Sequence, residues 1–368
     1  MKYIVAISRF IFGAVFMFSG FVKAVDPYGT AYKMEEYLNV FGMSSWFEAM
    51  PWIYIVTSVG LCCLEFVVGF IVFFHLCKRT SFWLAGLMML YFTILTLIDA
   101  LTNQVSDCGC FGDAIKLTNW ETFWKNVGLD VLLIIVIIFE KRKKVKPQTW
   151  KGVLVLFVAG FAVGFSIYNA MYEPCLDFRE WAVGNQMILP KAEQKPMESY
   201  ATYLNNETNK EKEFNMEELM EIYNQDTTFK ANWTFVSSRV LNPNEVKADG
   251  FSMGDLLSNE DKSFEFLSQE DTLYLIPCLD LNEVSDKAAE RTIAFAKSKI
   301  AENKPVALIT ATLPSQWITF IDKYKADKIT IYSTDDKAIK TIARSSIAVV
   351  ELFDGKVISK KSWRSLPQ

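Results

Sequence analysis

The run WIYIVTSVGLCCLEFVVGFIVFFHL (Trp52–Leu76) decides the fold of the first half of the chain. Among Asp, Glu, Lys and Arg it contains Glu65 alone. A helix crosses a hydrocarbon core of about 30 Å with roughly 20 apolar residues. Because this run exceeds that length, it predicts a membrane-spanning helix.

Four further runs approach the same length: Tyr3–Val25, Ser81–Leu101, Phe123–Phe139 and Val153–Met171. The run Phe123–Phe139 is the weakest, because its start carries Lys125 and Asp130. The run Tyr3–Val25 is longer than the apolar part of a typical signal peptide and ends without a small-x-small cleavage site, so we interpret it as an uncleaved signal anchor. The sequence therefore predicts five transmembrane helices.

Beyond about Glu173 the chain becomes polar and evenly patterned, which is typical of a soluble domain. We expect a membrane all-α helical bundle followed by a soluble α/β domain. The net charge is −4 and no large basic stripe occurs. Nucleic-acid binding requires clustered cations against phosphate, so this class of partner is excluded and the bilayer is expected instead.

Cationic loops predict the orientation of the helices. Lys and Arg residues lie between the second and third spans and between the fourth and fifth, namely Lys78, Arg79, Lys141, Arg142, Lys143, Lys144, Lys146 and Lys151. Such loops remain in the cytoplasm. We therefore expect a cytoplasmic N-terminus. The loops near 26–50 and 104–119, and everything after Tyr172, should then lie on the extracytoplasmic side.

The most specific motif is SDCGCFGD, Ser106–Asp113, in the second of these outer loops. Cys108 and Cys110 are separated by one glycine, whose backbone freedom allows their sulfurs to meet. A bridge in so small a ring departs from relaxed disulfide geometry and should be reduced easily, which favours thiol-disulfide exchange. Two alternatives are a structural staple and a metal site that adds Asp107 and Asp113, although zinc-binding cysteines are usually spaced more widely.

A nearby cation or helix N-terminus would favour the thiolate of this pair, and Lys116 and Lys125 are candidate cations. Cys175 and Cys278 are expected on the same side of the membrane. These two and the loop pair allow three disulfide connectivities. The adjacent Cys62 and Cys63 of the second span are interpreted as packing residues.

Glu65 is costly in hydrocarbon and is therefore a candidate functional residue. Arg9 lies at a comparable depth in the first span when counted from the cytoplasmic face, so we expect an Arg9–Glu65 ion pair. This pair would either join two helices or serve a proton-linked or quinone-linked role. No cofactor site is identified from the sequence, and a membrane quinone is the cofactor considered.

The motif CGCFG, Cys108–Gly112, resembles the methylamine utilisation protein MauE branch of the DoxX-like membrane proteins. FSGFVK, Phe18–Lys23, and the residues Asp26–Lys33 are similar to the DoxX-like proteins of Bacteroidetes. The resemblance covers roughly the first 140 residues and implies a four-helix membrane bundle in a bacterial inner membrane, with the C-terminal domain in the periplasm. It also implies maturation of a disulfide-rich exported protein together with a thioredoxin-like partner.

The C-terminal part predicts alternating strands and helices from Leu273 onward, closed by a hairpin at Asp354-Gly355. This order resembles a thioredoxin fold. Cys278 stands alone after the first strand, and Ile347 occupies the place where a cis-proline is expected, so the resemblance implies a degenerate thioredoxin-like domain. The expected divisions are 1–145 (bundle), 146–180 (fifth helix and neck), 181–265 (accessory region) and 266–368 (thioredoxin-like domain).

The leading functional hypothesis is a membrane thiol-disulfide factor whose Cys108 and Cys110 act on an exported client protein. The competing hypothesis is a non-enzymatic assembly or docking factor in which the CGC loop is structural. A third is a small-molecule or metal-handling protein that uses Glu65 and the loop carboxylates.

Overall fold

The computed structural model describes residues 2–43, 50, 52–76, 78–105, 108–139, 149–196, 198–225, 228–241, 244, 246–248 and 250–367. The chain divides into two compact units. The first is Met1–Arg179 with the short segments Ala343–Ser345 and Lys361–Leu366, and the second contains the remaining residues from Glu180 onward.

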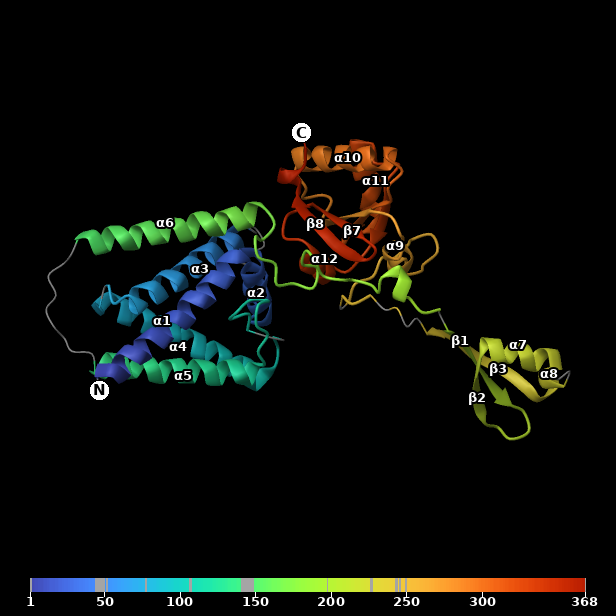
Figure 1. Ribbon diagram of the computed structural model, residues 1–368, viewed down its shortest axis with the longest axis horizontal. Helices are drawn as coiled ribbons and strands as arrows, with labels where there is room; N and C mark the ends of the chain where they lie inside the picture. The colour runs from blue at the N-terminus through green and yellow to red at the C-terminus, as the bar shows by residue number, and fades with distance from the viewer. Residues whose placement is uncertain are drawn as a thin grey trace. The chain divides into compact units, whose positions relative to one another are not determined.

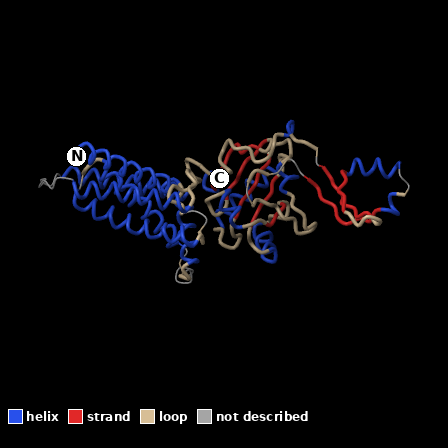
Figure 2. Tube along the Cα trace, turned by 90° about the horizontal axis from the view of Figure 1, so that it is seen from below, coloured by secondary structure: helices blue, strands red, loops and turns tan. Residues whose placement is uncertain are grey.

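The first unit is a helical bundle (Figures 1 and 2). Its helices are α1 (Lys2–Val25), α2 (Pro27–Val40), α3 (Trp52–Phe73), α4 (Lys78–Thr102), α5 (Asn119–Phe139) and α6 (Thr149–Met171). Among the described residues, five of these helices, all except α2, are long and apolar enough to cross a membrane. The expectation of a multi-pass membrane bundle is confirmed, and its core is formed by apolar side chains of α1, α3, α4 and α5.

Helices α1 and α3 pack backbone to backbone in antiparallel directions. A Cβ added at Gly20 would lie 2.4 Å from the backbone nitrogen of Phe66, and one added at Gly13 would lie 2.8 Å from that of Phe73. From the α3 side, Gly69 makes an equally close approach to α1. Small residues allow such contacts between membrane helices, so these glycines fix the register of the two helices.

The sequence predicted a loop where the structure has helix α2. Asp26 begins this helix, because its Oδ1 accepts a hydrogen bond from the backbone N–H of Gly29 at 2.9 Å. Pro27 occupies the first turn, where its missing N–H costs nothing. Tyr37 of α2 donates a hydrogen bond to Oδ2 of Asp99 in α4 at 2.5 Å. The helix has little apolar periodicity, which explains why the sequence pattern did not reveal it.

The second unit contains a five-stranded sheet in the order β6-β5-β4-β7-β8. Its strands are β4 (Leu273–Cys278), β5 (Val306–Thr310), β6 (Thr330–Ser333), β7 (Ala348–Phe353) and β8 (Lys356–Ser362). Strands β4, β5 and β6 are parallel, whereas β7 is antiparallel to β4. Helices α9 (Ser263–Leu267) and α12 (Asp336–Ile342) pack on one face, and α10 (Asp286–Ala301) and α11 (Trp317–Tyr324) lie on the other (Figure 1).

A smaller sheet, β2-β1-β3, has its own core. It consists of β1 (Glu198–Asn205), β2 (Glu211–Asn215) and β3 (Trp233–Leu241), with helices α7 (Met216–Gln225) and α8 (Phe229–Asn232). Short 3₁₀ turns are η2 (Lys191–Glu193), η3 (Pro314–Gln316) and η4 (Trp363–Ser365). The two sheets confirm the expectation of an α/β domain after the membrane helices.

Candidate functional site

Cys108 and Cys110 lie in the loop that connects α4 to α5. Gly109 between them has a positive φ of 62°, a conformation that glycine adopts without a steric penalty. The loop then turns, and the N–H of Gly112 donates to the carbonyl of Gly109 at 3.0 Å. Gly109 therefore adopts a backbone conformation, needed for this tight turn, that most other residues would adopt only at a steric cost.

Both cysteines are half-buried thiols in the structure, but their environments differ. The backbone N–H of Cys110 donates to Sγ of Cys108 at 3.2 Å. A hydrogen bond from the Cys108 thiol and the positive charges of Lys125 and Lys23 together lower the pKa of Cys110 from 9.0 to about 6, against the opposing effects of burial and of the Glu65 carboxylate. The same hydrogen bond and burial raise the pKa of Cys108 well above its ordinary value. Cys110 is therefore the thiolate of the pair.

Helix α1 holds the loop at Cys110. The hydroxyl of Ser19 donates to the carbonyl oxygen of Cys110 at 2.6 Å. One turn further along the same helix, Nζ of Lys23 donates to Oε2 of Glu65 at 2.6 Å, and both side chains are buried at 6% and 3% exposure. Residues four apart share one face of a helix, so Ser19 and Lys23 both face the loop side of α1.

The expected Arg9–Glu65 pair is wrong, because the structure pairs Glu65 with Lys23. The error lies in the assumed depth. The register of α1 against α3 places Gly20 beside Phe66, so Glu65 lies near the loop end of α1 and far from Arg9. Nε of Arg9 is buried and has no hydrogen-bond partner among the residues that the structure describes.

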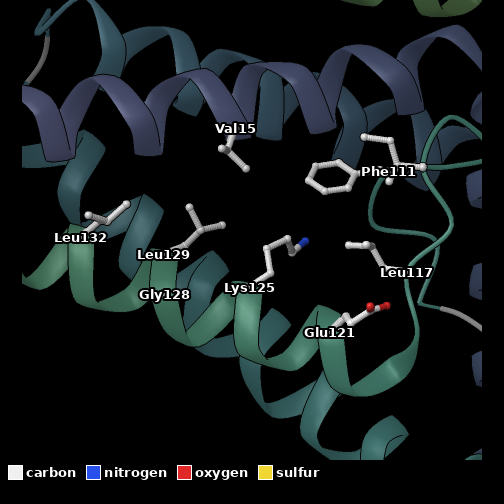
Figure 3. Close-up of a pocket in the computed structure, with 9 residues that line it drawn as sticks. Val15, Phe111, Leu117, Glu121, Lys125, Gly128, Leu129 and Leu132 are labelled. Carbon is white, nitrogen blue, oxygen red and sulfur yellow. The ribbon is translucent and has the colours of Figure 1, made fainter.

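Lys125 of α5 approaches the loop from the opposite side. Its Nζ lies 4.4 Å from the ring centroid of Phe111, within the range of a cation–π contact (Figure 3). The Phe111 ring also packs against Phe18, with 5.5 Å between the ring centroids. Lys116, the other cation named from the sequence, lines a small crevice together with Cys108 and Cys110. The sequence identified Lys125 but missed Lys23, because Lys23 lies at the end of a different span.

The remaining sequence candidates lie elsewhere. Asp107 falls outside the described residues, and within the described ranges no group of three or more His, Cys, Asp or Glu side chains is placed to hold a metal. Asp130 accepts a hydrogen bond from Thr93 at 2.7 Å. Cys278 ends β4 and is completely buried, and burial raises the pKa of its thiol. Cys175 is exposed, and its backbone N–H donates a hydrogen bond to Oδ1 of Asn169 at 2.9 Å.

The adjacent cysteines of α3 are both buried, at 0% for Cys62 and 6% for Cys63. The sulfur of Cys62 lies 3.8 Å from the hydroxyl oxygens of Ser58 and Thr30. These contacts agree with a packing role, in which weakly polar sulfur satisfies neighbouring hydroxyl groups.

Residues 1–139 match the family described as Methylamine utilisation protein MauE. The matched range contains α1 to α5 together with Ser19, Lys23, Glu65, both loop cysteines and Lys125. No curated protein and no solved structure matches the chain. The resemblance to MauE is thus confirmed for residues 1–139, and the match includes neither α6 nor the C-terminal α/β domain.

Proposed function

We propose that this MauE-like membrane protein exchanges disulfides with exported proteins through Cys108 and Cys110. The main support for this proposal is the difference in pKa between the two thiols. The pKa of Cys110 is lowered to about 6 by the Cys108 hydrogen bond and two cations, whereas that of Cys108 is raised. Thiol pairs that exchange disulfides need one good leaving thiolate, and this arrangement supplies it.

The exchange proceeds from the oxidised pair. A client thiolate attacks Sγ of Cys108 and forms a mixed disulfide, and Cys110 leaves with the electron pair as the thiolate. The second thiolate of the client then attacks the client sulfur of the mixed disulfide. This step releases Cys108 as a thiolate, which takes up a proton. The client dithiol is oxidised to a disulfide, and the cysteine pair is reduced to a thiol and a thiolate.

Lys23 and Glu65 act in this scheme as positioning residues. The carboxylate of Glu65 holds the ammonium group of Lys23 in place inside the bundle. The positive charge of Lys23 favours the thiolate form of Cys110, and this effect is larger than the opposing effect of the Glu65 carboxylate. This role explains why a costly charge pair is buried at the loop end of α1 and α3.

The proposal places the CGC loop and the C-terminal α/β domain on the extracytoplasmic side, where disulfides persist. The strand order of the larger sheet and its terminal hairpin agree with a thioredoxin-like domain. Because Cys278 is buried and lacks a second cysteine two residues away, we assign that domain to client binding and not to catalysis. Labelling of Cys110 by a membrane-impermeant maleimide in reduced spheroplasts tests this placement. Labelling only after the bilayer is disrupted would contradict it.

The competing function is a non-enzymatic assembly factor in which the bridge is a structural staple. The Ser19 hydroxyl and the Gly109–Gly112 turn hold the loop while both cysteines are thiols. These two contacts hold the loop independently of any bridge, which favours exchange over a staple.

The decisive experiment uses the Cys110→Ser variant in membranes. We expect it to accumulate a mixed disulfide between Cys108 and a client, while Cys108→Ser accumulates much less and Cys175→Ser behaves as the wild type. The bridge of the wild-type protein should also be reduced reversibly across a glutathione series. If both serine variants of the loop retain full client maturation, or if the bridge resists reduction, the exchange function is wrong.

A further inference from the structure

A groove lies between α1 and α5 on the surface of the membrane bundle (Figure 3). Its volume is about 620 Å³, and its walls are almost entirely apolar, with Val15 on α1 and Leu129 and Leu132 on α5. These residues lie well within helices that are long enough to span the bilayer. The groove is therefore open to molecules dissolved in the lipid.

The groove adjoins the crevice that contains the cysteine pair. Phe111, Ile115 and Leu117 line it, and the same residues line the crevice that contains Cys108 and Cys110. Phe111 follows Cys110 directly, so its ring separates the two spaces. A molecule in the groove would consequently lie one side chain away from the thiols.

The polar groups of the groove indicate what it binds. Lys125 points into the groove, with its Nζ at the Phe111 ring (Figure 3). A saturated acyl chain would fill the apolar walls but offer no acceptor to this ammonium group. A molecule with an apolar tail and a carbonyl oxygen at its head would satisfy both the walls and the half-buried Lys125, which needs a hydrogen-bond acceptor in an apolar surrounding. Glu121, the other charged residue of the groove, already accepts hydrogen bonds from Thr118.

We propose that this groove binds a lipid-soluble quinone, which accepts the electrons of the reduced cysteine pair. This inference rests on the proposed exchange function, since a pair that oxidises clients must itself be oxidised again. The Cys108 thiol and the Cys110 thiolate form the sulfur–sulfur bond and release two electrons and one proton. The quinone takes up both electrons, that proton and a second proton from water, and it leaves into the bilayer as a quinol.

Two glycines provide a matched pair of variants for the test. Gly128 of α5 lines the groove, whereas Gly160 of α6 is on another helix, and a Cβ added at either position meets no atom within 4 Å. Gly128→Phe should fill the groove without a clash inside the bundle. Gly160→Phe adds the same ring to a lipid-exposed position outside the groove.

The full-length protein is reduced, placed in quinone-free phosphatidylcholine nanodiscs, and mixed with decylubiquinone under anaerobic conditions. Quinol formation is followed by absorbance, and exchange with oxidised glutathione is measured in parallel. We expect one quinol per protein. We also expect Gly128→Phe to lower the ratio of the quinone rate to the glutathione rate by about tenfold or more, and Gly160→Phe to keep this ratio within about twofold of the wild type.

The outcomes separate the two proposals. If the wild type exchanges with glutathione but reduces no decylubiquinone, or if Gly128→Phe and Gly160→Phe reduce it equally fast, the groove holds only lipid chains and this inference is wrong. If the wild type fails to exchange with glutathione at all, the proposed function itself is wrong.

Discussion

Replacing Cys108 with alanine is expected to shift the pH at which Cys110 becomes reactive. The hydrogen bond from Cys108 is the largest cause that lowers the pKa of Cys110 from 9.0 to about 6. The Cys110 thiolate is therefore present above about pH 6 and is lost as the pH falls through that value. Without Cys108, the thiolate should be lost at a clearly higher pH, because burial and Glu65 raise the pKa of Cys110 and only the charges of Lys125 and Lys23 still lower it.

The size of the effect depends on the pH of the measurement. At pH 5 the thiolate fraction would be about one in ten for a pKa near 6 and about one in 10,000 for a pKa of 9.0, a ratio of roughly 1000. A more basic thiolate is intrinsically more nucleophilic, by roughly 20-fold for this difference in pKa, which leaves a net slowing of about 40-fold if the pKa of Cys110 returns to 9.0. At pH 7 the same comparison gives only about 4-fold.

The assay is alkylation of the reduced protein by iodoacetamide between about pH 5 and 9, with the modified Cys110 peptide quantified by mass spectrometry. Cys175→Ala serves as the control, because Cys175 is exposed and distant in sequence from the loop. A midpoint in Cys108→Ala that equals the wild-type midpoint would refute the reasoning, since the hydrogen bond would then have no effect on the Cys110 thiol.

Three further predictions concern stability. Glu65→Gln should lower the unfolding free energy by about 3–5 kcal/mol in mixed detergent micelles, because it leaves Lys23 buried without a counter-charge. The double variant Lys23→Met with Glu65→Leu should recover most of this loss. Equal losses in the single and the double variant would contradict the ion-pair explanation. Gly20→Leu should destabilise the bundle by at least about 1–3 kcal/mol by forcing α1 from α3, whereas Gly160→Leu should have no effect on the same unfolding curve. Leu275→Ala in the central strand β4 should lower the unfolding free energy of the C-terminal α/β domain by about 2–5 kcal/mol, because Leu275 is buried in its core. Pulse proteolysis of the full chain in urea measures this loss, and resistance equal to that of the wild type would disprove the place of Leu275 in the core.

The parts of the fold that depend on local patterns were predictable from the sequence. The spans follow from hydrophobic length, because a bilayer imposes the same requirement on every helix. The strands and helices that alternate from Leu273 onward, and the hairpin at Asp354-Gly355, were also predicted, because short apolar runs between polar turns have few alternatives. Helix α2 was missed, since its stability comes from a cap at Asp26 and contacts with neighbouring helices, which no periodic pattern records.

The candidate site was predictable only in part. The two cysteines could be named because they form one motif, and Lys125 because it lies near the start of the span that follows this motif. The partner of Glu65 could not, because it depends on the register of two antiparallel helices, which Gly13, Gly20 and Gly69 set through backbone contact. Counting residues from the membrane face gave the wrong depth, since α3 extends beyond the end of α1 toward the loop.

The hydrogen bond between Ser19 and the carbonyl of Cys110 determines which half of the cysteine pair moves during a redox cycle. Cys110 is anchored to a membrane helix, so its sulfur should keep nearly the same position in the dithiol and disulfide forms. Cys108 is joined to it through Gly109, whose backbone can rotate with little steric cost. Opening and closing of the bridge should therefore displace Cys108, and the moving sulfur is the one that meets the client.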